Sequence, residues 1–242
     1  MYSILEYHIM VDMKALSNAH TPGDLEESHY VGFTSNVNSE NEINQVGVSS
    51  NCTLTPIEKH QWFVFRVTYN QFHKVVTFLN SNQIITYLPQ KYVLRNINGK
   101  KKKVLVPLLN NIIFAYTTRD KADSVVKRSV CSHLKYYLDK TKDKELTGFH
   151  PPLTVGFSEM IDFIKITSLN NEHVLIFSAN KFDRKYKKGD KVRVINGDFK
   201  GVVGRVVRMA GQQRIVVEIE GLCFIATAYV PSAFIQPIDV VQ

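Results

Sequence analysis

Apolar residues along the chain recur with two periods, and each period predicts a different kind of element. The run Trp62–Phe65, followed by Val67, is aromatic and β-branched and predicts a buried strand. A helix is expected next, with Asn70 as its cap. Its inward face is marked by four residues at the spacing i, i+3, i+4 and i+7, namely Phe72, Val75, Val76 and Leu79.

The pattern then changes to a mixture of strands and helices up to residue 169. Two β-rich runs flank Asn98-Gly99, the dipeptide that favours a tight hairpin turn. Residues 110–118 predict another strand, Thr118 caps a helix that includes Val125 and Val126, and residues 133–138 predict a further strand. The last helix is expected to have Ser158 as its cap and four apolar residues inward: Met160, Ile161, Phe163 and Ile164. The order β-α-β-β-β-α-β-α predicts an α+β fold with an antiparallel sheet.

Short strands fill the rest of the chain, beyond a polar segment that reads as a linker. They are Val192–Val194, Val202–Val207, Ile215–Ile219, Phe224–Val230 and Phe234–Ile238. Turn residues separate these segments, and so many short strands in about 50 residues predict a small closed β-barrel.

The glycines of "KVRVINGDFKGVVGRVVRM" also resemble those of a phosphate-binding loop. Such a loop needs a helix after its glycines, but β-branched residues follow here and no G-K-[ST] is present. In a barrel, Gly197 supplies a turn, Phe199 closes the barrel end, and Gly201 and Gly204 let the next strand curve. We therefore interpret this stretch as part of a barrel.

The net charge of +8 is unevenly distributed. Residues 1–56 contain one basic and seven acidic residues, so residues 57–242 contain 30 − 1 = 29 basic and 22 − 7 = 15 acidic residues. Residues 57–242 therefore have a net charge of +14, and this part of the chain either binds a polyanion such as nucleic acid or simply has a solvated basic surface.

Other features of the composition indicate a cytoplasmic protein. The three cysteines, Cys52, Cys131 and Cys223, are odd in number and widely spaced, as in a reducing compartment. No apolar run is long enough to cross a membrane, and the first residues do not resemble a signal peptide. Residues 1–56 read as an acidic, disordered extension, or as the result of a misassigned start codon, since Met10 and Met13 are also present.

Two stretches resemble known domains. "GDKVRVINGDFKGVVGRVVRM" is similar to a KOW motif, and "WFVFRVTYNQFHKVVTFL" with "VPLLNNIIFAY" resembles the NGN domain of NusG-type transcription factors. This order is the NusG and RfaH architecture, and the chain looks most similar to the UpxY-like antiterminators of surface-polysaccharide operons. The resemblance implies four parts: an extension at 1–56, an NGN-like domain at 57–172, a linker at 173–187 and a KOW domain with an SH3-like barrel at 188–239.

The resemblance implies binding to the clamp of RNA polymerase through an apolar patch. It places Leu109 and Ile112 where relatives have aromatic contact residues, with Trp62 and Phe63 as further candidates. The alternative is that these side chains belong to the core. Arg119 lies near the position where relatives approach the opposite side of the polymerase channel.

Nucleic-acid contacts are expected at two places. Lys100, Lys101, Lys102 and Lys103 follow the predicted turn and either contact phosphates of non-template or upstream DNA or form a solvated loop. Arg66 and Tyr69 lie where relatives that read DNA sequence carry polar residues, and are otherwise ordinary surface.

The predicted barrel implies a second partner. Its loop at Glu220 and Leu222 corresponds to the tip that relatives offer to a ribosomal protein or to Rho. Those relatives carry an aromatic residue where this chain has Glu220, and Leu222 and Phe224 either replace it or pack inward. Some relatives also refold this domain into helices, although its Val and Ile content favours strands.

Enzymatic function is not expected, because no catalytic motif, cofactor site or metal-ligand spacing occurs. Cys131 and His133 are two residues apart, and His150 has no acidic or thiol companion in sequence. Two further hypotheses remain beside a specialised antiterminator: a general NusG-type factor, and a KOW-containing protein that binds RNA or the ribosome.

Overall fold

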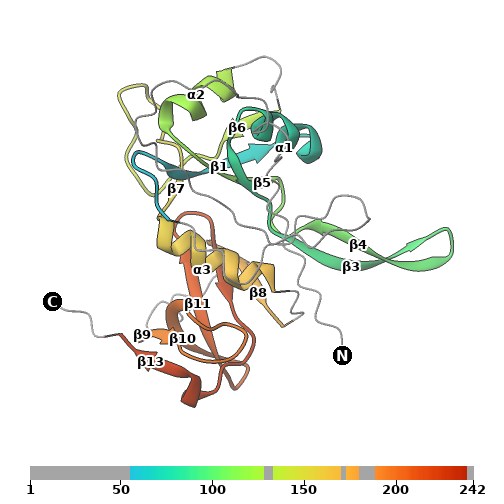
Figure 1. Cartoon of the computed structure of the whole chain (residues 1–242), viewed down its shortest axis with the longest axis vertical. Helices are drawn as coiled ribbons and strands as arrows, with labels where there is room; N and C mark the ends of the chain where they lie inside the picture. The colour runs from blue at the N-terminus through green and yellow to red at the C-terminus, as the bar shows by residue number, and fades with distance from the viewer. Residues whose placement is uncertain (1–54, 128–132, 170–172, 180–188, 239–242) are drawn as a thin grey trace, which may run out of the picture. The chain divides into compact units, whose positions relative to one another are not determined.

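The computed structural model describes residues 55–127, 133–169, 173–179 and 189–238. These residues form two compact units. The first unit combines the described chain up to Leu88 with the segment Leu109–Tyr136. The other combines Pro89–Leu108 with the chain from Tyr137 onward. Antiparallel sheets and a few helices make up both units, which confirms the predicted α+β class (Figure 1).

Strand β1 (Gln61–Val67) and helix α1 (Phe72–Ser81) begin the first unit. Both were predicted, and the four apolar residues at helical spacing are the buried residues of α1. The predicted cap is wrong. Asn70 has a φ of +56°, and Gln71 is the N-cap residue, without a side-chain hydrogen bond. Tyr69 and Asn70 are both left-handed because the chain reverses direction there.

The remaining elements of this unit are β2 (Ile85–Tyr87), β5 (Ile112–Thr117), α2 (Arg119–Lys127) and β6 (Leu134–Tyr136). The strands lie in the order β2-β5-β1-β6. Thr118 caps α2 as predicted, because its hydroxyl accepts a hydrogen bond from the Lys121 N–H at 3.4 Å. A core cluster joins one face of the sheet, which carries Phe63, Phe65 and Ile113, to the apolar sides of α1 and α2.

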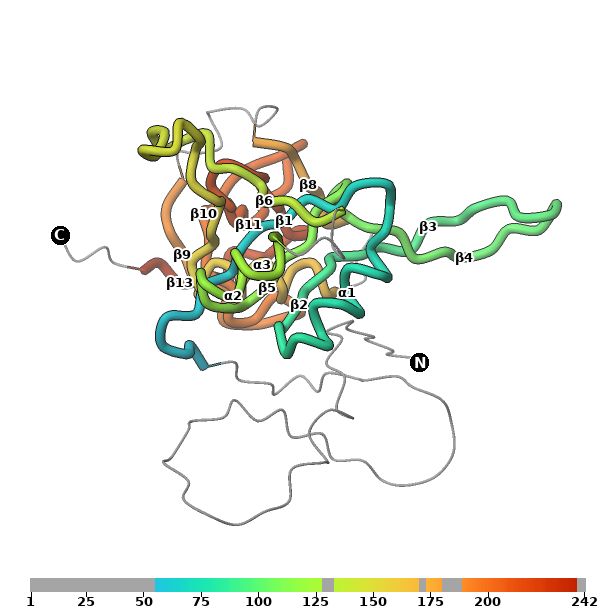
Figure 2. The backbone as a smooth tube through the Cα atoms, turned by 90° about the horizontal axis from the view of Figure 1, so that it is seen from above, coloured from blue at the N-terminus to red at the C-terminus, as the bar shows by residue number. Residues whose placement is uncertain are grey.

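Strands β3 (Gln90–Ile97) and β4 (Lys100–Pro107) form a separate two-stranded ribbon in the second unit. The tube in Figure 2 shows the two strands side by side along their whole length. Asn98 and Gly99 have φ values of +53° and +74°, as a two-residue hairpin turn requires, so the predicted turn is confirmed. The chain before the turn forms two strands, β2 and β3, which are separated by Leu88-Pro89.

The second unit continues with β7 (Thr154–Val155) and α3 (Phe157–Ser168). The N-cap residue of helix α3 is Gly156 and not the predicted Ser158, which is exposed in the first turn. The carboxylate of Glu159 accepts a hydrogen bond from the Gly156 N–H at 3.2 Å and so satisfies one donor of the helix start. Three of the four residues predicted to point inward are buried, and Ile161 is half-buried.

Six strands form the C-terminal sheet, in the order β13-β9-β10-β11-β12-β8. Their bounds are β8 (Leu175–Ser178), β9 (Lys191–Val194), β10 (Val203–Met209), β11 (Gln212–Ile219), β12 (Cys223–Ala226) and β13 (Ile235–Pro237), with a 3-10 turn, η5 (Ser232–Phe234), before β13. Five strands were predicted. Strand β8 was not, because it falls in the segment interpreted as a linker.

The pairing of this sheet is open within the described residues, since β13 and β8 form its two ends. A closed barrel is therefore not shown. The core cluster of the sheet contains Val207, Met209, Val216, Phe224 and Ala226. Helix α3 packs against β11. The four-part division of the chain stays a prediction.

Candidate protein and nucleic-acid interfaces

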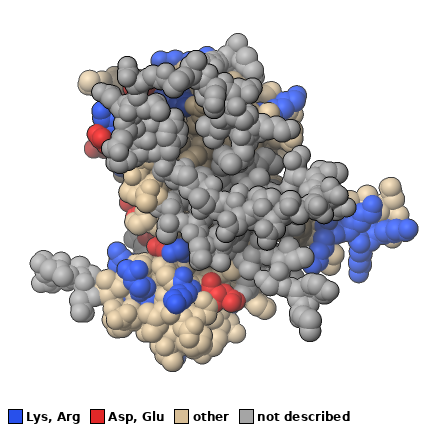
Figure 3. All heavy atoms as spheres, in the orientation of Figure 1, with Lys and Arg blue, Asp and Glu red and all other residues tan. Residues whose placement is uncertain are grey.

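The four consecutive lysines lie on strand β4 itself, starting directly after the turn. Lys100, Lys101, Lys102 and Lys103 are paired in register with Ile97, Asn96, Arg95 and Leu94 of β3. Side chains alternate between the two faces of a strand, so two of the lysines lie on each face of the ribbon. All four are exposed, and Figure 3 shows Lys and Arg atoms gathered on the hairpin.

Arg66 and Tyr69 lie at the end of β1, where the chain turns toward α1. The Tyr69 side chain is 83% exposed and meets the ring of His133 edge-on, with 5.7 Å between ring centroids. His133 is held because its carbonyl accepts a hydrogen bond from the Thr68 N–H at 2.9 Å. Arg66 is exposed and lies opposite Lys135 of β6. This end of the sheet therefore presents an aromatic ring beside two cations.

Arg119 is the first residue of α2, and it makes a local network. Its Nε donates to both oxygens of Asp123, at 3.3 and 3.1 Å, and its guanidinium lies over the Tyr136 ring, 5.8 Å from the centroid. The Tyr136 hydroxyl donates to Asp123 Oδ1 at 2.7 Å. Burial, followed by the hydrogen bond and the charge of Asp123, raises the pKa of Tyr136 far above its usual value. Arg119 is thus oriented while still half-exposed.

The four residues predicted to form an apolar patch that binds RNA polymerase differ in how far they are buried. Leu109 is half-buried, in the turn before β5. Ile112, Trp62 and Phe63 are buried, with 5%, 1% and 1% of their surface exposed. Phe63 belongs to the core cluster, and Trp62 contacts the Tyr116 ring, with 5.1 Å between centroids. Leu109 is therefore the member of this set that is accessible in the structure.

The glycines of the proposed KOW motif have clear steric roles. Gly197 and Gly201 have φ values of +80° and +85°, which residues with a Cβ rarely adopt. A Cβ on Gly204 would lie 2.5 Å from the Val216 carbonyl oxygen, so β10 and β11 approach each other too closely for a side chain. Phe199 is buried, and its predicted role of closing a barrel end stays a prediction.

The β11–β12 turn carries Glu220, Gly221 and Leu222. Glu220 is exposed, whereas Leu222 is buried and packs inward, as does Phe224. Gly221 lies against the segment before β7, since a Cβ there would be 3.3 Å from Asp139 Oδ1. Leu222 and Phe224 are therefore not exposed and do not replace the aromatic residue that relatives carry at the position of Glu220.

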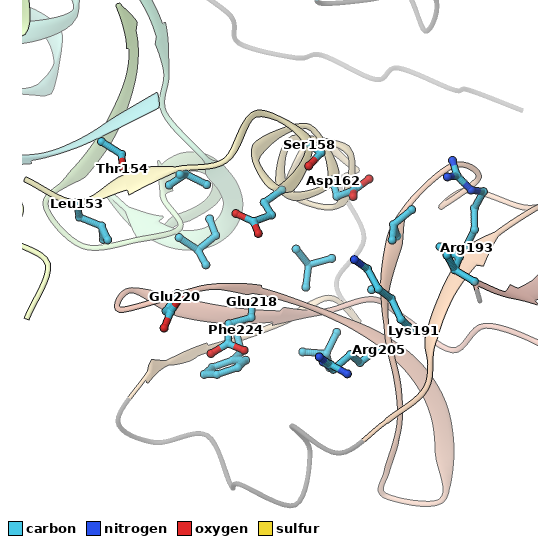
Figure 4. Close-up of a pocket in the computed structure, with 18 of the residues that line it drawn as sticks. Leu153, Thr154, Ser158, Asp162, Lys191, Arg193, Arg205, Glu218, Glu220 and Phe224 are labelled. Carbon is cyan, nitrogen blue, oxygen red and sulfur yellow. The ribbon is translucent and has the colours of Figure 1, made fainter. Parts of the chain in front are cut away.

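A cleft of about 710 Å³ lies within the second unit, between α3 and the C-terminal sheet. Figure 4 shows Ser158 and Asp162 on the helix side, Glu218 and Glu220 on the sheet, and Lys191 extending from the sheet toward the helix. Its lining is mixed in charge, so it does not favour one class of ionic ligand. Sequence analysis did not anticipate this cleft, because it depends on how α3 packs.

Asp162 is a buried carboxyl group at this cleft. Burial raises its pKa to about 6, although a hydrogen bond from the Val203 backbone and the charges of Lys165, Arg193 and Lys191 act in the opposite direction. The Lys165 ammonium lies 3.9 Å from Asp162 Oδ1 and also donates to the Gly201 carbonyl at 3.4 Å. These contacts connect α3 to the turn before β10.

The described residues contain no group of three or more possible metal ligands among His, Cys, Asp and Glu. Cys52 and Cys131 lie outside them. Cys223 is buried, and burial raises the pKa of its thiol to about 12. His150 is occupied by a contact between its Nδ1 and the Lys142 carbonyl oxygen at 2.8 Å. Among the described helices, none is both long and apolar enough to span a membrane.

One exposed feature was missed by sequence analysis. The loop before β7 displays Leu146 and Phe149, both exposed, although its backbone is held by hydrogen bonds between Glu145 and Phe149 and between Gly148 and Glu145. Nothing in the local sequence distinguishes these two side chains from buried ones, since the loop has no periodicity.

Comparison with known proteins gives one family. Residues 60–142 match the family model described as "Transcription termination factor nusG". No curated protein matches the chain. Among solved structures, the one described as "Domain interaction in Thermotoga maritima NusG" is 17% identical; the match covers 75% of this chain and 98% of that chain, with a TM-score of 0.34. Residues 60–142 of this chain are therefore similar to the NusG family domain.

Proposed function

We propose that this protein is a NusG-like transcription elongation factor that binds RNA polymerase without catalysing a reaction. The observation that carries the proposal is the match of residues 60–142 to the NusG family model. That range covers β1, α1, β2, the hairpin, β5, α2 and β6. Suppression of pausing or termination would then follow from binding alone, and the setting would be the cytoplasm.

Leu109 and Arg119 are the proposed contacts with polymerase. Leu109 is apolar and accessible at the turn before β5, so it can enter an apolar groove on the clamp. Ile112 follows in β5 and is buried, so its proposed role is to support that turn. Trp62 and Phe63 support the same sheet from β1. Arg119 offers an oriented cation at the start of α2.

DNA contacts are proposed at the four lysines of β4 and at the end of β1. Tyr69 presents an exposed ring on which a base can stack, and Arg66 places an exposed cation at the same end of β1, where it is proposed to contact a phosphate or a base edge. Contacts of this kind would recruit the factor to a DNA element exposed during transcription. The hypothesis that these residues are ordinary surface predicts no change in recruitment when they are replaced.

The C-terminal sheet is proposed to be an SH3-like KOW domain that recruits a second factor. The steric roles of its glycines and the antiparallel order of β9 to β12 support this proposal. Ribosomal protein and Rho are the candidate partners. Because Glu220 is the exposed side chain of the β11–β12 turn and Leu222 is buried, the partner surface is expected to be polar.

We further propose a specialised antiterminator of a surface-polysaccharide-type operon. The acidic segment 1–56 and the non-aromatic Leu109, Ile112 and Glu220 favour this hypothesis over a general factor. Chromatin association confined to one operon would support the specialised role, and association with most transcribed genes would support the general one.

The testing experiment is retention of the full chain on purified bacterial RNA polymerase. Leu109→Asp is the test variant, since Ile112→Asp would place a charge in the core and unfold the unit. Leu146→Asp is the matched control, because Leu146 is fully exposed elsewhere. Binding by the parent and the control, with loss in Leu109→Asp, is expected. If the parent sediments with ribosomal subunits and does not bind polymerase, the ribosomal alternative replaces this proposal.

A further inference from the structure

The hairpin β3–β4 is the most strongly charged segment of the described chain. Between Pro89 and Leu108 there are six basic residues and no acidic one: Lys91, Arg95, Lys100, Lys101, Lys102 and Lys103. All six are exposed. Their carboxylate partners therefore cannot come from the hairpin itself, and a polyanion is the partner that fits this charge.

The register distributes these cations over both faces of the ribbon. Residues directly opposite each other in an antiparallel pair lie on the same face. One face carries Arg95 opposite Lys102, together with Lys91 and Lys100. The other carries Lys101 and Lys103. A flat anionic surface would contact one face only and would leave the other set of charges in water.

Arg95 and Lys102 make the charge pattern unfavourable for the hairpin alone. Like charges directly opposite each other in a sheet destabilise the pair of strands. Three apolar side chains of the ribbon, Tyr92, Leu94 and Ile97, are also 38–67% exposed. A segment that keeps like charges together and apolar side chains in water indicates a surface built for a partner.

The dimensions of the ribbon decide between forms of nucleic acid. Each strand has eight residues, which at about 3.4 Å per residue gives a ribbon roughly 27 Å long. The two-residue turn at Asn98-Gly99 keeps its tip narrow. The major groove of duplex DNA admits a two-stranded β-ribbon, and phosphates then lie on either side of it. A single strand would follow one face.

We propose that hairpin β3–β4 enters the major groove of duplex DNA, with the cations of its two faces contacting the phosphates of the two DNA strands. This inference rests on the proposed function insofar as it names the form of DNA that the factor contacts. It adds Lys91 and Arg95, which sequence analysis did not assign, to the four lysines of β4.

The test measures binding of the full chain to a duplex of about 30 base pairs without polymerase, at several salt concentrations. Two variants each remove two cations from one face: Arg95→Gln/Lys102→Gln and Lys101→Gln/Lys103→Gln. Lys140→Gln/Lys144→Gln is the control with the same change of charge, at exposed residues outside the hairpin. Circular dichroism verifies that all variants are folded.

Each contacted phosphate contributes about −0.9 to the slope of log K against log salt. Each face variant is expected to reduce the magnitude of the slope by about 2 and the affinity at 0.1 M salt by about tenfold, with a much smaller effect in the control. The proposal is overturned if only one face matters, if a single strand of the same length binds as tightly as the duplex, or if the parent does not bind duplex.

Retention on polymerase, measured on the same proteins, separates this inference from the proposed function. A chain that binds duplex through both faces and does not bind polymerase refutes the elongation-factor role and leaves the groove contact standing. A chain that binds polymerase and whose DNA affinity is unchanged in both face variants refutes the groove contact alone.

Discussion

Arg95 and Lys102 lie directly opposite each other on one face of hairpin β3–β4, two cations in adjacent strands. Their repulsion is greatest at low ionic strength, where surface charges are least screened. The hairpin should therefore be less stable than its turn and pairing would allow, and a change that weakens DNA binding should stabilise it.

Arg95→Gln is accordingly expected to slow hydrogen exchange of the hairpin amides at low salt, by the equivalent of about 0.2–1 kcal/mol. Lys101→Gln is the comparison, because Lys101 lies opposite Asn96 and has no cation across from it. Equal protection in the two variants would show that cross-strand repulsion is not the cause.

Gly204 should be among the glycines least tolerant of substitution in the C-terminal sheet. A Cβ there would lie 2.5 Å from the Val216 carbonyl oxygen and 2.7 Å from Ile215 Cγ2, so β10 would have to move away from β11. Gly204→Ala is expected to cost about 2 kcal/mol or more, as overpacking does. Gly211→Ala meets no atom within 4 Å and should cost about 1 kcal/mol, from its φ of +77° alone. Melting temperatures of both variants would reveal the order, and a milder effect at Gly204 would contradict the steric argument.

Local sequence signals predicted most elements of the fold and failed where packing decides. The spacing of Phe72, Val75, Val76 and Leu79 and the Asn98-Gly99 turn need no tertiary information, and both were confirmed. Two of the three predicted helix caps were wrong, because Asn70 is used for the chain reversal and α3 starts before Ser158, with Glu159 accepting a hydrogen bond from the Gly156 N–H. Strand β8 was missed, since it depends on the exposed edge of β12, which no local pattern reveals.

The candidate sites were less predictable than the fold. A family pattern assigns Ile112 by its position in a motif, whereas its burial depends on which face of β5 it occupies. The cations of the hairpin could be counted from the sequence, but their division between two faces required the register. No sequence pattern indicated that Asp162 is buried, because a carboxylate on a helix is normally exposed.

Tyr136 should stabilise the first unit through its hydroxyl. That hydroxyl donates a hydrogen bond to Asp123 Oδ1 at 2.7 Å. Without the hydroxyl, the half-buried Asp123 carboxylate would lose one hydrogen-bond donor. Tyr136→Phe is expected to cost about 1 kcal/mol of unfolding free energy. Arg119→Gln should cost less, because its ion pair with Asp123 is exposed to solvent.

The same two variants distinguish a structural role from a contact with polymerase. If Arg119 contacts polymerase, Arg119→Gln will weaken retention on polymerase more than Tyr136→Phe does, despite its smaller effect on stability. Retention that decreases in proportion to stability in both variants would assign Arg119 a structural role only.

Asp162 should make the second unit less stable as the pH rises. Its pKa is raised from 3.8 to about 6 in the folded protein, so between these values the folded state binds a proton that the unfolded state has released. The resulting stability is fully present below the unfolded pKa and is lost as the pH passes through about 6. A pKa raised from 3.8 to about 6 corresponds to about 3 kcal/mol of unfolding free energy at neutral pH.

Asp162→Asn keeps an oxygen to accept the hydrogen bond from Val203 and removes the charge. We therefore expect it to match the parent near pH 4 and to exceed it in melting temperature at about pH 7. Asp143→Asn, at an exposed residue, is the control and should have the same melting temperature as the parent at both pH values. A loss of stability in Asp162→Asn at neutral pH would mean that the ionised carboxylate, with Lys165 and Lys191 nearby, holds α3 on the sheet more strongly than burial opposes it.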